Sequence, residues 1–218
     1  MDNAERREQR EDLRERIVEA ARDIVGEEGL DALSMRALAV RIGYSPATIY
    51  LHFQDKDEIL RGVMEEGFKR LAATMERERE ALPPDVTSLE RYAATGRAYA
   101  RFAVENTGYF RAMFKMPKVA NLEVCADPLE RPGAGSGEVV GEGGNHGVGL
   151  ICEAIAAGHM SAPDPRRAAL VGWGVMHGLT SLYLSGHLSD QVGSHEEFME
   201  LIESAIETLR SGWRPRPE

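Results

Sequence analysis

Basic and hydroxyl side chains gather in a stretch of the chain that contains no carboxylate. Residues 34–54 include no Asp or Glu, although acidic residues outnumber basic ones 36 to 26 over the whole sequence. The stretch and the position just after it carry these donors: Ser34, Arg36, Arg41, Ser45, Thr48, Tyr50, His52 and Lys56. Hydroxyls, basic side chains and helix N-terminal N–H groups bind phosphates, so the segment indicates close approach to DNA. Taken singly, each donor also fits a helix cap, a packed ring or a weak surface ion pair.

A second group of side chains could bind a small molecule. Trp173 and His177 are four residues apart, so they share one face of a helix, and Gly178 leaves room for a close neighbour. With aromatic and sulfur-containing side chains they predict a mostly apolar cavity with one titratable group. The same side chains could instead simply fill a core. The candidates are Tyr99, Phe102, Phe110, Met113, Phe114, Trp173, Met176 and His177.

Patterns typical of enzymes and metal sites are missing from the sequence. There is no His-Glu-x-x-His, the glycine run at 133–144 lacks the order of a dinucleotide or phosphate loop, and Cys125 and Cys152 fit no metal or redox spacing. We therefore expect no catalytic activity, metal or cofactor. A helical enzyme built on Trp173 and His177, or a structural adaptor, are alternatives, but neither explains the acid-free segment.

The bulk composition is that of a globular protein without a membrane segment. Of the 218 residues, 43% are hydrophobic and 28% charged, and the net charge is −10. This charge excludes a protein that coats nucleic acid over its whole surface but leaves room for a local DNA-binding face. No apolar stretch reaches the roughly 20 residues of a membrane span, and no signal core is present. We therefore expect a cytoplasmic protein that does not contact membranes.

Apolar spacing of three and four residues predicts an all-α fold. Ser34 and Ser45 are suited to cap two short helices that Gly43 separates. No alternating segment indicates a strand, and residues 117–149, rich in Gly and Pro, predict a loop. The expected helices cover 13–25, 35–42, 46–52, 56–80, 88–105, 109–115, 148–158, 165–188 and 196–209.

Two short helices joined by a tight turn are typical of a helix-turn-helix at about residues 34–53. The stretch IVEAARDIVGEEGLDALSMRALA followed by IGYSPATIYLHFQDKDEIL resembles the N-terminal domain of TetR-type transcriptional regulators over about residues 11–60. Tyr44 replaces a smaller aliphatic residue, and Pro46-Ala47 replaces a polar-Gly pair. These departures bear on base specificity rather than on the class of protein.

The resemblance implies a role for each residue of the segment. Residues at the start of the second short helix face base edges or adjoining phosphates: Ser45, Pro46, Ala47 and Thr48. Tyr50 and His52 reach the DNA backbone, and Ile49 and Phe53 belong to the core. Ser34 and Arg36 bind the phosphate beside the first short helix. Lys56 binds the phosphate at the N-terminus of the long helix expected at 56–80.

The C-terminal part carries a shorter resemblance. The run GWGVMHGLTSLYLSG resembles the Trp-x-x-x-His-Gly signature of one subgroup of TetR-type C-terminal domains. The resemblance implies a repressor, with activation as the alternative. The aromatic rings, the flexible Met113 and Met176 and the one titratable group predict a small, largely apolar, aromatic or flat effector that releases the protein from DNA.

We also expect a homodimer, because the last two long helices expose more apolar surface than one small domain covers. Its operator is then an inverted repeat. The interface candidates are Ala168, Val171, Leu184, Phe198, Leu201, Ile202, Ala205 and Leu209. The expected domains are 1–57 for DNA binding, with 1–10 a mobile arm, 58–212 for ligand binding and dimerisation, and a tail at 213–218.

Overall fold

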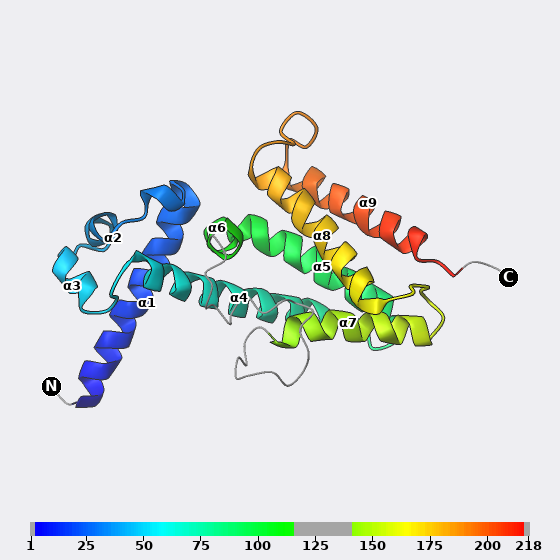
Figure 1. Ribbon diagram of the computed structural model, residues 1–218, viewed down its shortest axis with the longest axis horizontal. Helices are drawn as coiled ribbons and strands as arrows, with labels where there is room; N and C mark the ends of the chain where they lie inside the picture. The colour runs from blue at the N-terminus through cyan, green and yellow to red at the C-terminus, as the bar shows by residue number, and fades with distance from the viewer. Residues whose placement is uncertain (1–2, 116–140, 216–218) are drawn as a thin grey trace. The chain divides into compact units, whose positions relative to one another are not determined.

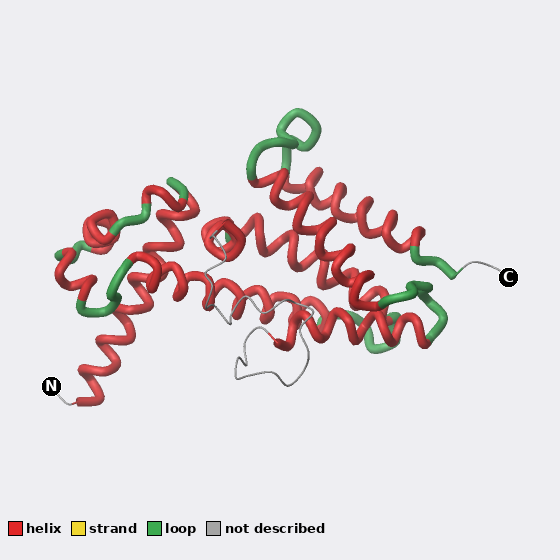
Figure 2. Tube along the Cα trace, viewed as in Figure 1, coloured by secondary structure: helices red, strands yellow, loops and turns green. Residues whose placement is uncertain are grey.

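The fold is helical throughout the part of the chain that the structure describes. The structure is a computed structural model that describes residues 3–115 and 141–215, and within these ranges it contains no strand (Figures 1 and 2). The predicted all-α class is therefore confirmed. The helices are α1 Asn3–Glu27, the 3-10 helix η1 Leu30–Ala32, α2 Met35–Ile42, α3 Pro46–Tyr50, α4 Lys56–Glu80, α5 Ser88–Glu105, α6 Thr107–Lys115, α7 Gly141–Ala156, α8 Pro165–Leu184 and α9 His195–Gly212.

Several helix bounds differ from those expected. Helix α1 begins at Asn3, so the residues expected to form an arm are helical from this point on. Helix α7 begins at Gly141 rather than near residue 148, so the predicted loop is wrong over 141–147. The reason is tertiary packing: α7 lies against α5 and α8, where Ile151 and Ala154 are fully buried. The rest of that predicted loop, up to residue 140, lies outside the described residues.

The first compact unit comprises residues 3–68 and 106–115. Its core is built by α1, α2, α3, α4 and α6, and its fully buried large side chains are Ile17, Ile24, Leu33, Leu38, Ile49, Phe53, Ile59, Leu60, Met64 and Tyr109. Packing thus extends this unit beyond the boundary expected after residue 57 and adds α6, which comes some forty residues later in the chain.

Helices α1 and α6 approach each other through glycine. A Cβ atom added at Gly108 would stand 2.2 Å from the backbone oxygen of Arg22, and one at Gly26 would stand 3.2 Å from the Cα of Gly108. Arg111 Nη1 donates to the oxygen of Gly26 over 2.6 Å and so satisfies a carbonyl at the end of α1. No side chain larger than hydrogen fits at Gly108 without moving the two helices apart.

The second compact unit comprises residues 69–105 and 141–215. Helix α5 is its centre, because it packs against α7, α8 and α9 (Figure 1). One part of the core joins α5, α7 and α8 through Leu89, Ile151, Ala154, Met160, Ala168 and Ala169. The part toward α9 contains Phe198 and Ile202, both fully buried. No helix of the described residues is both long and apolar enough to cross a membrane.

Candidate functional site

The two short helices of the first unit are capped as their sequence predicts. Ser34 Oγ accepts the N–H of Ala37 over 3.1 Å at the start of α2. Gly43 ends α2 with a φ of 74°, a left-handed conformation that glycine adopts without strain. Ser45 Oγ accepts the N–H of Thr48 over 3.2 Å, and Pro46 follows at the first turn of α3. These local bonds fix the turn between the helices and hence the direction of α3.

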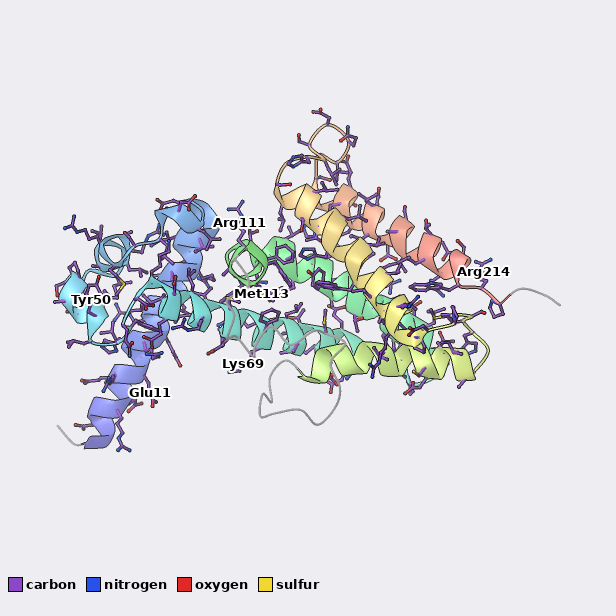
Figure 3. The ribbon with its side chains drawn as sticks, viewed as in Figure 1. Glu11, Tyr50, Lys69, Arg111, Met113 and Arg214 are labelled. Atoms are coloured by element: carbon purple, nitrogen blue, oxygen red, sulfur yellow. The ribbon has the colours of Figure 1, made fainter. Side chains whose placement is uncertain are left out.

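The predicted recognition face, formed by α2, the turn and α3, is open to solvent, while the side chains behind it are buried. Ile49 and Phe53 are 0% and 1% exposed, which confirms them as core. Tyr50, labelled on α3 in Figure 3, is 57% exposed. The other predicted DNA-binding residues divide into exposed ones, Ser34, Arg36, Ser45, Pro46 and Ala47, and half-buried ones, Thr48, His52 and Lys56.

The basic side chains of residues 34–56 differ in whether a carboxylate of the same chain already pairs with them. Arg41 pairs with Glu27, the last residue of α1, and with Glu28 over 2.9 and 3.0 Å, so two carboxylates offset the one charge at the end of α2. Lys56 Nζ donates over 3.4 Å to the backbone oxygen of Leu30. This acceptor is a neutral carbonyl, so it does not offset the charge of the lysine. Arg36 is exposed and makes no ion pair with any other described residue. Arg36 and Lys56 are therefore the cations of the segment that remain for a phosphate.

His52 lies in the turn between α3 and α4, beside arginines of α1. Its backbone oxygen accepts from Arg14 Nη1 over 2.5 Å, and its buried Nδ1 has no hydrogen-bond partner among the described residues. Burial lowers the pKa of His52, and the charges of Arg10 and Arg14 lower it further. The imidazole is thus neutral near pH 7, so it would contact a phosphate through a hydrogen bond rather than as a cation. The sequence analysis did not predict that α1 belongs to this site.

The sequence analysis also did not predict two exposed apolar side chains near the DNA-binding residues. Val40 on α2 and Leu51 after α3 are 84% and 72% exposed in the unit that carries the recognition face. The signal was present in the sequence: Leu38 and Ile42 mark the inner face of α2, which leaves Val40 outside. Apolar atoms at such positions can contact the methyl group of thymine.

The second candidate site contains one hydrogen-bonded aromatic group. Tyr99 Oη and His177 Nδ1 are 2.7 Å apart, and the ring of Trp173 lies 5.3 Å from that of His177 at 33°. Burial raises the pKa of the Tyr99 hydroxyl and lowers the pKa of His177. The tyrosine is thus protonated and the imidazole neutral, so one ring nitrogen of His177 carries a proton and the other accepts a hydrogen bond. Nε2 lies 3.4 Å from Ser181 Oγ.

The other candidates for ligand binding fall into two groups. Phe110, Met113 and Phe114 belong to α6 in the first unit, where the rings of Phe110 and Phe114 are 4.9 Å apart and Met113 packs on Gly67 (Figure 3). Phe102 and Met176 belong to the second unit with Tyr99, Trp173 and His177, and both are buried. The structure therefore brings together Tyr99, Trp173 and His177, and it buries Phe102 and Met176 in the same unit.

The candidates for a dimer interface also divide by burial. Ala168, Phe198 and Ile202 are 5%, 0% and 0% exposed in the single chain, and Phe198 stacks on Tyr183 at 4.2 Å. These three cannot meet a partner, because the chain's own core already covers them. Leu184, Leu201, Ala205 and Leu209 are half-buried, and Val171 is exposed.

The apolar surface of the second unit lies instead on the outer face of α8. Leu170, Val171 and Leu182 are 46%, 51% and 44% exposed. Gly174 and Gly178 lie on the same face by their spacing, and a Cβ at either glycine would meet no atom within 4 Å. An apolar helix face with two glycines permits another helix to approach closely.

Two family profiles and several known proteins match the chain. Residues 17–63 match "Bacterial regulatory proteins, tetR family", and residues 92–209 match "Tetracyclin repressor-like, C-terminal domain". The chain is 36% identical over 120 residues to an uncharacterized HTH-type transcriptional regulator of Haemophilus influenzae, over 55% of this chain and 63% of that protein. It is 30% identical over 112 residues to an HTH-type transcriptional regulator of Mycobacterium tuberculosis, over 51% of this chain and 47% of that protein. The matched part thus spans less than two thirds of these relatives.

Solved structures extend the likeness to most of the chain. A protein of unknown function from Rhodococcus sp. RHA1 is 30% identical, with a TM-score of 0.68 over 93% of this chain and 96% of that one. A TetR-family regulator from Haemophilus influenzae has a TM-score of 0.63 at 21% identity, over 94% and 97% of the two chains, which supports the fold alone. The curated relatives are described as transcriptional regulators and not as enzymes.

Proposed function

The chain belongs to the TetR family of bacterial regulatory proteins, and on that premise we propose that it is a sequence-specific DNA-binding transcription regulator. The observation that carries the proposal is the face formed by α2, the turn and α3. That face is exposed, contains no carboxylate between residues 34 and 54, and stands on the buried side chains of Ile49 and Phe53. A regulator of this kind works on the chromosome, so we expect it in the cytoplasm.

The proposed regulator acts as a homodimer on an inverted repeat. Helix α3 has five residues and reads few base pairs alone, so two copies must enter successive major grooves about 34 Å apart. The exposed face of α8, with Leu170, Val171 and Leu182, supplies an apolar surface that two copies can share about a two-fold axis. The half-buried Leu184, Leu201, Ala205 and Leu209 are further candidates for the same interface.

The proposed effector is a small, largely apolar, aromatic or flat molecule that binds beside Trp173 and His177. The two rings offer a stacking surface, and the neutral imidazole, whose Nδ1 lies beside Tyr99 Oη, leaves Nε2 as one polar atom for a hydrogen bond. We retain membership of the Trp-x-x-x-His-Gly subgroup as part of this proposal. Effector binding favours a dimer in which the spacing of the two α3 helices does not match successive major grooves. The protein is thus a repressor that the effector releases from DNA.

Selection from a library of random-sequence duplexes tests the proposed function. The wild-type protein should enrich a palindromic motif. Ala47→Gln, at an exposed position in the first turn of α3, should enrich a different motif with the same symmetry, because the amide adds hydrogen bonds to base edges. Enrichment of no sequence by the folded wild-type protein contradicts the proposal.

The effector site needs its own test, in which Trp173→Ala is compared with the wild type on the selected duplex. The variant should bind the duplex as the wild type does but should no longer release it when extracts of small molecules from the host are added. If the folded variant releases DNA normally, the effector binds elsewhere. If the variant does not fold, Trp173 is a core residue, and the proposed site is wrong.

A further inference from the structure

The first turns of α1 extend beyond the core of their unit. Ile17 is the first fully buried side chain of the helix, Leu13 is half-buried, and the side chains described before Leu13 are exposed. At about 1.5 Å per residue, residues 3–13 form a rod of roughly 16 Å. Nothing in the packing of the described residues requires this part of the helix, so its surface chemistry indicates what it contacts.

Arginines occupy one face of this rod. Arg7, Arg10 and Arg14 are separated by three and four residues, which places them on one side of the helix. Ile17 and Ala21 follow Arg10 and Arg14 by seven residues, and both are 0% exposed. The face that is apolar inside the core is therefore continued by arginines where the packed helices end.

Carboxylates occupy a different face of the same rod. Glu8, Glu11 and Glu15 are also separated by three and four residues, about 100° around the helix from the arginines. The charges are thus sorted into two stripes, although the helix as a whole is nearly balanced. A polyanion that met this helix would be attracted to the arginine stripe and repelled by the other.

The arginine stripe leads directly to the turn between α3 and α4. The guanidinium of Arg14 lies 4.0 Å from the ring centre of Phe53, donates to the oxygen of His52 and pairs with Glu58 over 3.1 Å. Arg10 is close enough for its charge to lower the pKa of His52. Glu58 already offsets the charge of Arg14, whereas Arg7 and Arg10 are exposed and form no ion pair with the rest of the described chain.

We propose that Arg7 and Arg10 bind phosphates of the DNA duplex beside the base pairs that α3 contacts. The stripe is complementary to DNA in charge and continuous with His52, which belongs to the proposed recognition surface. The N-terminal part of α1 thus acts as a second, sequence-independent grip that lengthens the footprint of each protomer. The inference rests on the proposed function, because it adds contacts to the same complex.

The test compares Arg7→Gln/Arg10→Gln with Arg166→Gln/Arg214→Gln in the full-length protein. Gln keeps the helix propensity, and each pair removes two exposed positive charges, the second pair from the other unit. On the selected duplex, the first variant should reduce the slope of log affinity against log salt by about 1.8 per bound protomer, since each phosphate contributes about 0.9. Between 50 and 200 mM salt the wild type should lose about 12-fold more affinity per protomer than this variant.

Shortening the duplex separates contact from a general charge effect. Removing the base pairs that flank the selected motif should weaken binding by the wild type and the Arg166/Arg214 variant but leave binding by the Arg7/Arg10 variant unchanged. Equal salt slopes and equal sensitivity to trimming in all three proteins overturn the inference while the proposed function stands. If the folded wild type selects no duplex, both proposals fail.

Discussion

Gly108→Ala tests the contact between α1 and α6 that attaches residues 106–115 to the first unit. The added Cβ would stand 2.2 Å from the oxygen of Arg22 and 2.9 Å from its Cγ. The oxygen belongs to the backbone of α1, so it cannot move without the helix, and the two helices must separate by about 1 Å to reach ordinary contact. That separation also strains the bond from Arg111 to Gly26.

The expected cost follows from these contacts. Overpacking of this kind costs about 1–3 kcal/mol, and the better helix propensity of Ala offsets less than about 1 kcal/mol of it. We therefore expect Gly108→Ala to lower the free energy of unfolding by roughly 1–3 kcal/mol, with a fall in Tm of about 2–4 °C per kcal/mol. Urea and thermal unfolding followed by circular dichroism measure both quantities.

Gly149→Ala is the matched control. Gly149 lies inside α7, and a Cβ there would meet no atom within 4 Å, so the same substitution should stabilise the protein by about 0.5–1 kcal/mol. The two variants must therefore shift the unfolding midpoint in opposite directions. A Gly108→Ala protein that unfolds at or above the wild-type midpoint refutes the close approach of α1 and α6.

Three further predictions concern the proposed interface, pH and DNA. Val171→Glu puts a carboxylate on the exposed apolar face of α8, so light scattering should show a monomer in place of a dimer, and binding to the palindromic duplex should weaken. A variant that is still dimeric would show that this face is not the dimer interface. Burial lowers the pKa of His177, so the folded state binds fewer protons than the unfolded state, and stability should be lost as pH falls below about 6.5. His177→Asn should reduce that slope, by at most about 1.4 kcal/mol per pH unit, in urea unfolding between pH 5 and 7.5, whereas an unchanged slope would place the titration elsewhere. Lys56→Ala should reduce the salt slope of DNA binding by about one per half-site and Tyr50→Phe should weaken binding to all sequences, whereas unchanged affinity in both would remove these residues from the interface.

The helix-turn-helix was predictable because its determinants are local. Ser34 and Ser45 bond to N–H groups three residues away, and Gly43 adopts a conformation that few other residues tolerate. Ile49 and Phe53 follow the apolar spacing of two short helices over a common core. Such signals lie within a few residues of each other, so the sequence alone reveals them.

Features that depend on distant parts of the chain were not predictable. The apolar spacing of α9 showed that Phe198 and Ile202 must be buried, but not whether their own chain or a partner covers them. The attachment of α6 to α1 depends on Gly26 and Gly108, which are far apart in sequence and carry no pattern. Helix α7 contains many glycines, so its propensity for a loop is overridden only by the packing of Ile151 against α5 and α8.

Hydroxyl-radical footprinting of the selected duplex tests the central claim most directly, because it reports where each protomer grips DNA. The account predicts two symmetric protected regions, centred about one helical turn or slightly more apart, on one side of the duplex. Both regions should become shorter at their outer edges with Arg7→Gln/Arg10→Gln. A single asymmetric region, or uniform weak protection along the duplex, would contradict a dimeric regulator that reads DNA through α3.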